Sequence, residues 1–463
     1  MLVWLLAASP ASADTIYLKN GRKIVADSVR EKGSHYQYDI GDDSYAIPKS
    51  SVDRVEAGGM PVQSSAAAKV GDLPAFVPNN TLAYEGDLTA KIIKEGKVDA
   101  DALSAMERRG NSDLTATADF IAGKFEFEHG NIAQARQYFE AALRAQPDNS
   151  TILIYYAALL VRTGSAAQAL TYAQRAARSA PDSPDAYTML GYAQFASDHT
   201  KEAVASWKRS LQLRPDSAVQ HLLDKAQREQ TAESDFSQNE SSHFVLHYEG
   251  HQTSEALRAQ ILGALESDYD DLARDLGNPP HDSILVTLYT EQAFFDVTNA
   301  PTWSGAINDG KLRIPISGLS SMTPDLARVL KHELAHSFVN QLSGGRCPPW
   351  LHEGIAQFLE PKSLGGSGRQ LSMLFKAQRN IPLNALEGSF MRFSGVEAYV
   401  AYAESLAAVS YINDSYGMSD VQRILQRISE GSSTEAALRA TIHSDYGQLE
   451  SEVAKYLSDR YGD

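Results

Sequence analysis

Residues 323–345 read TPDLARVLKHELAHSFVNQLSGG, and this stretch decides the fold of the C-terminal half of the chain. Thr323 suits the N-cap of a helix, Pro324 its first position and Asp325 its first turn. Apolar residues then recur at helical spacing, namely Leu326, Val329, Leu330, Leu334 and Phe338. The two glycines at the end of the stretch favour a stop. The sequence therefore predicts one capped, amphipathic helix.

The middle of this predicted helix carries a His-Glu-x-x-His motif. His332 and His336 are four residues apart, so both imidazoles lie on one helix face and can bind one metal ion. Glu333 follows the first histidine, where its carboxylate can take a proton from a water at the metal. Such spacing also arises by chance, but its place inside a capped helix favours hydrolysis of an amide by a metal-activated water.

A third ligand is expected downstream, because a catalytic zinc site has three protein ligands and leaves one position for water. Residues 348–356 read PPWLHEGIA, and the prolines open a second helix there. Glu353 of this helix can face the two histidines if the Gly- and Pro-containing loop folds the helices together. His352 is the alternative ligand. Adjacent helical residues point about 100° apart, so only one of the two can face the metal.

The segment HELAH followed by WLHEGIA resembles the gluzincin metallopeptidases, the group of thermolysin and the zinc aminopeptidases. More closely, the region from about Phe244 to the C-terminus resembles the peptidase MA-like domain of bacterial proteins that carry tetratricopeptide repeats. The resemblance implies a thermolysin-like α+β fold and a Zn2+ cofactor. It also implies that His332, His336 and Glu353 are the zinc ligands. Glu333 would then be the general base and the later proton donor.

A tyrosine of the C-terminal region also fits the gluzincin pattern. Residues 402–406, YAESL, are similar to the Tyr-x-Lys-Gly-Ala motif of the aminopeptidases, with Glu and Ser in place of Lys and Gly. The resemblance implies that Tyr402 stabilises the oxyanion, a role that needs a preorganised O–H near the developing charge. Packing alone is the alternative, because Tyr399, Tyr402 and Tyr411 also suit an amphipathic helix.

Residues 303–315, WSGAINDGKLRIP, are predicted to form a turn and a short strand. They precede the predicted helix that carries His332 and His336. Gluzincins use an edge strand at this place to bind the substrate backbone as an added strand. The resemblance therefore implies that substrate is bound by four consecutive residues, Gly305, Ala306, Ile307 and Asn308. The likeness to the aminopeptidase motif that grips a free N-terminus is superficial, since its glutamate is missing and Asp309 is offset. The segment gives no reason to expect aminopeptidase activity.

Composition restricts the class of protein. The chain has 463 residues, of which 22% are charged and 43% hydrophobic, with a formal net charge of −16. This length is sufficient for several domains with cores of their own. Nucleic acid and anionic lipid are not expected as partners, because both reward Lys and Arg. After the first few residues, no stretch approaches the length of a transmembrane segment.

The N-terminus indicates export. Residues 1–13 combine an apolar run with the ending Ala-Ser-Ala, which is typical of a signal peptide, although the positive first part is absent. A disordered terminus, or a start further upstream, is the alternative. Cys347 is the only cysteine, so no internal disulfide can form; this fits a reducing compartment or an exported bacterial protein without disulfides. We expect a periplasmic or secreted protein in which Cys347 is structural, because a fourth protein ligand would block the catalytic position. A redox role or inhibitory coordination of the metal by Cys347 is the alternative.

The region after the signal peptide is expected to be a small all-β module at 14–57. Asn20-Gly21 between two β-rich runs predicts a hairpin, and the alternation around Tyr36-Gln37-Tyr38 predicts further strands. Residues 58–81 are rich in Gly, Pro, Ser and Ala and are expected to be a linker. The sequence does not assign a function to the module.

The middle of the chain holds an internal repeat of 34 residues. Prolines followed by Asp recur at this step, as do alanines: Pro147, Pro181 and Pro215, and Ala135, Ala169 and Ala203. Gly123 and Gly191 share one register, and Phe139 and Trp207 share another. This period, with small residues where helices cross, resembles tetratricopeptide repeats. An α-solenoid is expected over 82–230, with clear repeats at 116–217.

These parts predict a multidomain α+β protein whose metallopeptidase domain spans 240–463. We expect a zinc-dependent peptidase, with a peptide or protein substrate and a protein partner bound through the repeats. One alternative is a non-enzymatic adaptor in which the repeats bind a partner and the metallopeptidase-like domain is structural. Another is a zinc hydrolase of non-peptide amides. The motifs do not specify the substrate or distinguish endo- from exopeptidase activity.

Overall fold

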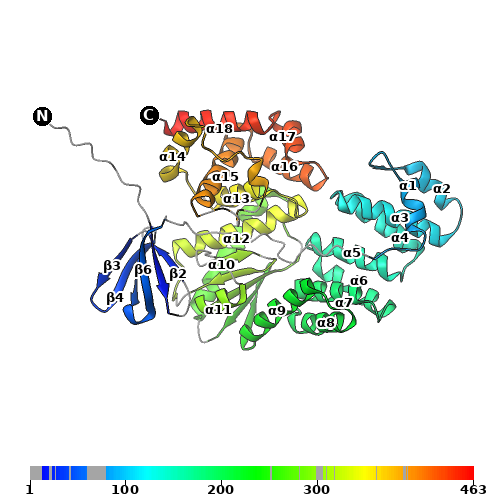
Figure 1. The fold of residues 1–463 in the computed structure, drawn as a ribbon, viewed down its shortest axis with the longest axis horizontal. Coiled ribbons are helices and arrows are strands. Elements are labelled where there is room, and N and C mark those ends of the chain that lie inside the picture. Colours follow the sequence, from blue (N-terminus) through cyan, green and yellow to red (C-terminus); the bar gives the residue numbers. More distant parts are fainter. Residues whose placement is uncertain are drawn as a thin grey trace.

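A computed structural model gives the fold of the chain. It describes residues 13–19, 23–26, 28–40, 43–59, 80–250, 253–280, 282–298, 306–308, 310–316, 319–360, 362–388, 390, 393 and 395–462. Most of the expected signal peptide, most of the expected linker and Gly305 therefore lie outside the described residues. Figure 1 shows the N-terminal strands, the solenoid, and a C-terminal region in which a second group of strands lies below α12 and the later helices.

The N-terminal strands form two three-stranded sheets with antiparallel pairing. One sheet has the order β2-β1-β6 and the other β3-β4-β5. The elements are β1 (Ala13–Leu18), β2 (Lys23–Ala26), β3 (Ser28–Lys32), β4 (His35–Ile40), β5 (Asp43–Pro48), the 3-10 turn η1 (Lys49–Ser51) and β6 (Val52–Gly59). The expected hairpin turn at Asn20-Gly21 lies outside the described residues, but β1 and β2 on either side of it do pair.

Helices follow in pairs. They are α1 (Glu85–Ile92), α2 (Ala100–Glu107), α3 (Ser112–Glu128), α4 (Ile132–Ala145), α5 (Ser150–Arg162), α6 (Ala166–Ser179), α7 (Pro184–Ala196), α8 (Thr200–Leu213) and α9 (Ser217–Ala232). A short hairpin, β7 (Ile93–Lys94) and β8 (Lys97–Val98), separates α1 from α2. Side chains cap the starts of several helices; Asn149, for example, accepts the backbone N–H groups of Thr151 and Ile152.

The packing inside the repeats explains the residues that recur in sequence. A Cβ on Gly123 would lie 2.7 Å from the Phe139 ring, and one on Gly191 would lie 2.4 Å from the Trp207 indole. Glycine is therefore needed where each pair of helices crosses over a large aromatic residue. Phe139 and Trp207 are both fully buried, so the two repeats use the same crossing.

The turn between the two helices of each repeat has the same backbone conformation. Gly130, Gly164 and Asp198 stand 34 residues apart, and their φ angles are 78°, 73° and 62°. A residue in the left-handed backbone conformation makes the turn between the two helices of each pair. Of the three residues, only Asp198 has a Cβ. We call these three residues the turn row.

The C-terminal half is built around a five-stranded sheet of order β12-β13-β11-β10-β9. The central strands β10 (Phe244–Glu249), β11 (Ile284–Tyr289) and β13 (Leu312–Pro315) are parallel, and the edge strands β9 (Phe236–Glu240) and β12 (Ile307–Asn308) are antiparallel to their neighbours. Helices α10 (Glu255–Leu276) and α11 (Glu291–Thr298) connect the strands. Strand β9 precedes the expected domain start at 240 but pairs with β10.

The remaining chain is helical. It comprises α12 (Pro324–Ser343), α13 (Pro349–Leu359), α14 (Gly365–Lys376), the 3-10 turn η2 (Ala385–Glu387), α15 (Gly395–Tyr416), α16 (Met418–Ser429), α17 (Thr434–Ile442) and α18 (Tyr446–Tyr461). One hydrophobic core joins the sheet, α10, α12, α13 and the C-terminal helices, and a separate core fills the solenoid. Within the described part of the chain, no helix has the length and apolar character needed to span a membrane.

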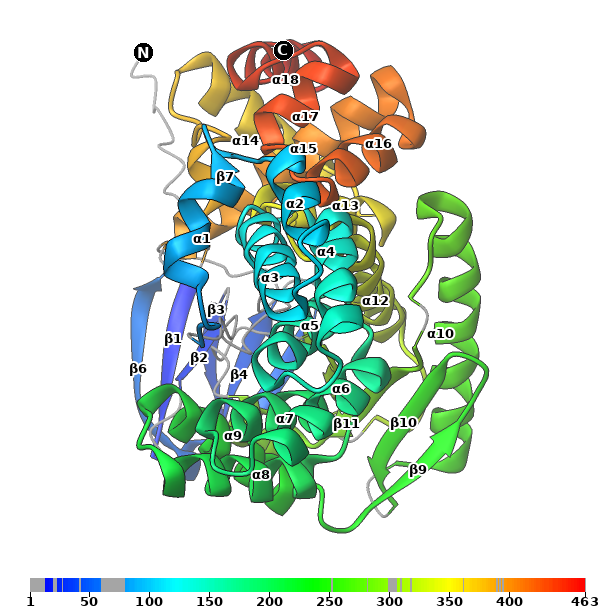
Figure 2. The ribbon, with the colours of Figure 1, turned by 90° about the vertical axis from the view of Figure 1, so that its right-hand side faces the viewer.

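The solenoid lies along one side of the C-terminal half. In Figure 1 it stands beside the sheet and α12, and in Figure 2, turned by 90°, it lies in front of them. The two large hydrophobic cores are separate, and a smaller apolar cluster around Phe294 and Val297 of α11 packs against Ala232 of α9.

Candidate metal centre

Helix α12 positions the first two candidate ligands. Its ends agree with the predicted signals: Thr323 Oγ1 accepts the N–H of Leu326 at 3.1 Å, and Gly344 ends the helix with a left-handed φ of 59°. His332 and His336 lie one turn apart in the middle of the helix, and both are buried. The helix therefore presents two imidazoles to the interior of the domain.

Helix α13 positions the third candidate ligand, Glu353. It begins at Pro349, and Glu353 lies in its second turn, buried against α12 and α15. The next residue is glycine for a steric reason. A Cβ on Gly354 would lie 2.4 Å from the carbonyl oxygen of Ser405 and 2.6 Å from Val409 Cγ2. Gly354 therefore lets α13 approach α15 closely, which fixes the position of Glu353.

The three side chains converge. The distance from His332 Nε2 to His336 Nε2 is 3.1 Å, and Glu353 Oε2 lies 3.6 Å from the first and 3.8 Å from the second. Ligands about 2.0–2.1 Å from a tetrahedral zinc ion are separated by about 3.3 Å, so this triangle has the dimensions of a zinc site. Among the residues that the structure describes, these form the only group of three or more His, Cys, Asp or Glu side chains able to hold a metal ion.

One buried oxygen in this group has no hydrogen-bond donor, as is expected of an atom that binds a metal ion. Glu353 Oε2 is buried without a hydrogen-bond donor, and burial raises the pKa of this carboxyl group. A buried carboxylate oxygen without a donor is costly unless a cation compensates it. The residues present therefore fit a zinc ion, because two imidazoles and one carboxylate match its preferred donors.

His352, the alternative third ligand, lies elsewhere in the cluster. Its ring stacks on that of His336, with centroids 4.4 Å apart and an interplanar angle of 4°. Burial lowers the pKa of His352 to about 3, so its imidazole is neutral. The structure thus places the carboxylate of Glu353, and not the ring of His352, with the two Nε2 atoms.

Glu360 joins the site although the sequence analysis did not single it out. Its Oε2 lies 3.3 Å from His332 Nδ1, on the side of the ring away from Glu353. Burial alone would lower the pKa of His332, but Glu353 and Glu360 raise it to about 10. A signal was available: Glu360 follows Glu353 by seven residues, or about two helical turns, and so shares its helix face.

Glu333 is fully buried next to the first histidine. Its backbone carbonyl accepts a hydrogen bond from Asn308 Nδ2 at 2.7 Å, and the same amide group contacts Ser337 Oγ at 2.8 Å. The side chain of Asn308 therefore attaches β12 to α12, the helix that carries the two candidate histidine ligands. Ala306 and Ile307 are buried as well. Gly305 lies outside the described residues.

Tyr402 lies on α15 in a packed environment close to the site. Its ring makes an edge-to-face contact with Phe390 at 5.4 Å, and its backbone carbonyl accepts the amide of Gln357 at 2.9 Å. Burial raises the pKa of Tyr402 well above its usual value, and the carboxylates of Glu353 and Glu333 raise it further. The phenol thus stays protonated near both carboxylates and can donate a hydrogen bond.

Cys347 lies in the loop between α12 and α13. Burial, followed by the charge of Glu353, raises the pKa of its thiol well above the usual value. The group of candidate ligands does not include it. The thiol therefore stays protonated near the centre.

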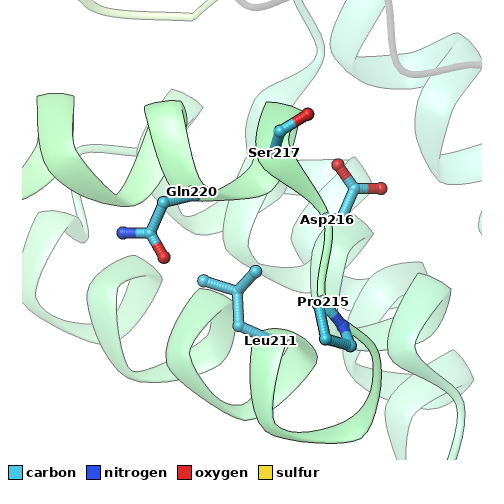
Figure 3. A pocket seen from close by; sticks show the side chains of 5 residues that line it. All are labelled: Leu211, Pro215, Asp216, Ser217 and Gln220. Atoms are coloured by element: carbon cyan, nitrogen blue, oxygen red, sulfur yellow. The ribbon is translucent and has the colours of Figure 1, made fainter.

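A shallow hollow lies away from this centre, on the solenoid between α8 and α9 (Figure 3). It is lined by Leu211, Pro215, Asp216, Ser217 and Gln220. The carboxylate of Asp216 caps α9 by accepting the N–H groups of Ala218 and Val219 at 2.8 and 3.2 Å. The residues that line the hollow thus form the connection between α8 and α9.

The fold and the centre together define a metallopeptidase-like domain preceded by helical repeats. Comparison with known families makes the class specific: residues 268–459 match the Peptidase MA superfamily, and residues 100–150, 122–184 and 157–218 match the tetratricopeptide repeat. The chain thus combines a Peptidase MA superfamily domain with N-terminal tetratricopeptide repeats, as its sequence motifs predicted. No curated protein matches the chain in sequence.

Proposed function

We propose that this protein is a zinc-dependent peptidase of the gluzincin type. The observation that carries the proposal is the buried triangle of His332, His336 and Glu353 beside the carboxylate of Glu333. The match to the Peptidase MA superfamily over 268–459 supports the same class. The substrate is a peptide or protein, and the tetratricopeptide repeats recruit it or an adaptor.

The two histidines and Glu353 would hold the zinc ion. Zinc bound there supplies Lewis acidity, for acidifying a water and polarising a carbonyl. Glu360 Oε2 lies 3.3 Å from His332 Nδ1 and would accept its proton, which would keep the Nε2 lone pair directed at the metal position. Helix α13 preorganises Glu353, because Gly354 lets it pack closely against α15, and α13 in turn packs against α12, which carries the two histidines.

Glu333 and Tyr402 would perform the proton transfer and the oxyanion stabilisation. The carboxylate of Glu333 takes a proton from the attacking water and then delivers it to the nitrogen of the leaving amine. The O–H of Tyr402 donates to the oxygen that becomes negative in the transition state. Its raised pKa keeps that proton in place through the reaction.

The edge strand β12 is the proposed site for the substrate backbone. Ala306, Ile307 and Asn308 would contribute N–H and C=O groups to an added strand, together with Gly305. The position of β12 supports this role, since it is an edge of the sheet and Asn308 joins it to the carbonyl of Glu333. A peptide bound along β12 would thus lie next to the general base.

The proposal includes a domain division and a location. The division is a signal peptide at 1–13, an all-β module at 14–57, a linker at 58–81, an α-solenoid at 82–230 and a thermolysin-like domain at 240–463. The described strands at 13–59 and the mixed sheet with an antiparallel edge support this division. The sequence of the N-terminus supports export to the periplasm or beyond.

Cleavage of a mixed peptide library tests the function. The zinc-loaded protein should cleave peptides, a chelator should abolish cleavage, and added zinc should restore it. The matched control is Glu333→Gln, which keeps the size of the side chain but cannot take up the proton. Cleavage that persists in this variant, or no cleavage by the zinc-loaded wild type, would favour the adaptor or the hydrolase of other amides.

A further inference from the structure

The junction between the solenoid and the sheet is ionic and buried. The sheet contributes Lys311 and Arg313, which are 4% and 0% exposed, and α9 contributes Glu229, which is 0% exposed. The carboxylate of Glu229 lies between the two cations: Oε1 is 2.6 Å from Lys311 Nζ and Oε2 is 2.8 Å from Arg313 Nη2. We call these three residues the junction cluster.

Neighbouring groups complete the hydrogen bonding of the junction cluster. Lys311 Nζ is 2.8 Å from Asp198 Oδ1 and lies 4.8 Å from the centre of the Phe195 ring. Arg313 Nη1 donates to Tyr289 Oη at 2.8 Å and lies 3.8 Å from Glu233 Oε1. The acids come from the α7–α8 turn, from α9 and from its C-cap Glu233, and Lys311 and Arg313 come from the sheet, so opposite charges join the two parts.

The turn row extends the contact between the solenoid and the peptidase domain over three repeats. The carbonyl of Gly130 accepts Arg346 Nη1 at 3.0 Å, and Arg346 belongs to the loop between α12 and α13. A Cβ on Gly164 would lie 3.3 Å from Gln341 Oε1, near the end of α12. Asp198 contacts Lys311. Three successive repeats thus touch the peptidase domain through the same turn, which fixes the direction of the solenoid along it.

A short path of contacts leads from the junction cluster to the general base. Arg313 stands opposite Ile307 in the pairing of β13 with β12, and the neighbouring pair is Asn308 with Leu312. Asn308 Nδ2 donates to the carbonyl oxygen of Glu333. Moving β13 would therefore move β12 and its bond to the helix that carries the candidate ligands.

We propose that Glu229, a residue of the solenoid, is a positioning residue for the substrate-binding edge of the peptidase domain. It holds Lys311 and Arg313, which fix the position of β13 and, through the pairing of the two strands, the position of β12. The inference rests on the proposed function for the role of β12. It assigns the solenoid a part in substrate binding that is separate from recruiting partners.

The test uses Glu229→Gln in the full-length, zinc-loaded protein. The matched control is Asp185→Asn, which removes a buried solenoid acid that pairs with Arg214 inside the solenoid. Amide hydrogen exchange is followed in peptides that span β12 and β13. Glu229→Gln should speed exchange there at least tenfold, and the control should leave it unchanged. Equal exchange in wild type and Glu229→Gln, or equal acceleration in both variants, would overturn the proposal.

Kinetics supply the second measurement. Glu229→Gln should raise KM for peptide cleavage at least fivefold with a smaller change in kcat and unchanged zinc content, because it displaces the binding strand and not the ligands. An unchanged KM would overturn the assignment. If no peptide is cleaved by any form while exchange still responds to Glu229→Gln alone, the proposed function fails and the positioning of the strand stands.

A milder substitution guards against failure to fold. Asp198→Asn removes the second carboxylate from Lys311, and its side chain is 22% exposed. It should shift exchange in β12 and β13 in the same direction as Glu229→Gln, by about threefold. Unchanged exchange in this folded variant would count against the proposal even if Glu229→Gln cannot be purified.

Discussion

The protein contains two buried polar clusters that differ in how their charges are balanced. In the junction cluster, Glu229 lies between Lys311 and Arg313, and oppositely charged side chains satisfy each other. In the metal centre, two imidazoles and Glu353 converge, and Glu353 Oε2 is buried without a donor. The first cluster is complete within the protein, whereas the donor set of the second fits a zinc ion. Buried polar groups therefore have two roles in this protein: those of the junction cluster join two parts of the fold, and those of the metal centre are candidate ligands.

The largest effect is expected from removing a ligand of the second cluster. His336→Ala should abolish stoichiometric zinc binding and peptide cleavage, because two remaining ligands cannot form a closed site. Elemental analysis of the purified protein measures the first, and the peptide assay the second. Zinc should also raise the melting temperature of wild type and not of the variant, since binding to the folded state alone stabilises it. A full zinc content in the variant would contradict the ligand set.

Glu333→Gln should separate chemistry from metal binding. The variant should keep its zinc and its fold, and turnover should fall by about 10²–10⁴-fold, the range for loss of a general base. Parallel elemental analysis and kinetics on one preparation measure both. A variant that loses zinc would show that Glu333 supports the centre in another way.

A substitution in the junction cluster should lower the free energy of unfolding and leave the zinc content unchanged. Arg313→Met leaves Glu229 with one cation fewer in a fully buried position, which should cost about 3–5 kcal/mol of unfolding free energy. Arg439→Met, which breaks an exposed pair with Glu435, should cost about 1 kcal/mol or less. Urea unfolding of both variants measures the difference. Similar costs for the two would remove the distinction between the junction and a surface ion pair.

A smaller effect is expected at Glu360, which contacts His332 Nδ1. Glu360→Gln retains an acceptor oxygen but loses the charge, so zinc affinity or turnover should fall about 10–100-fold. Competition with a zinc chelator gives the affinity. An unchanged affinity and turnover would assign Glu360 to packing alone.

Asp119 of α3 offers the smallest effect and a pH dependence. Burial, with Glu107 nearby, raises the pKa of Asp119 to about 7. The folded state then holds a proton that the unfolded state has lost above its ordinary value of 3.8, so stability falls as pH rises through this window. Asp119→Asn should therefore stabilise the protein by about 1 kcal/mol or more at pH 8 and by little at pH 4. Thermal unfolding at both pH values measures this; equal shifts would contradict the raised pKa.

Local signals in the sequence predicted much of the fold. Helix α12 begins and ends where Thr323 and the glycines at 344–345 indicate, because capping depends on neighbours in sequence. The 34-residue period was predicted, and the tetratricopeptide match confirms it. The pairs Gly123 with Phe139 and Gly191 with Trp207 give that period its steric reason.

Contacts between distant segments could not be predicted. Glu229 and Arg313 are 84 residues apart, and nothing next to either of them in sequence indicates an ion pair. Asn308 was expected to bind substrate, but the residue is buried and its side chain is hydrogen-bonded to the Glu333 carbonyl and to Ser337. Side-chain direction depends on how a strand meets a helix, and a motif does not record that geometry.

The turn row limits how this solenoid can evolve. Each of its three turns meets a different segment of the peptidase domain, at Arg346, Gln341 and Lys311. A solenoid attached by one end can gain or lose a repeat without disturbing the others. Here, an inserted or deleted unit would shift every later turn away from its contact and separate Glu229 from its cations. The contacts of the turn row therefore tie the spacing of these three repeats to the domain beside them.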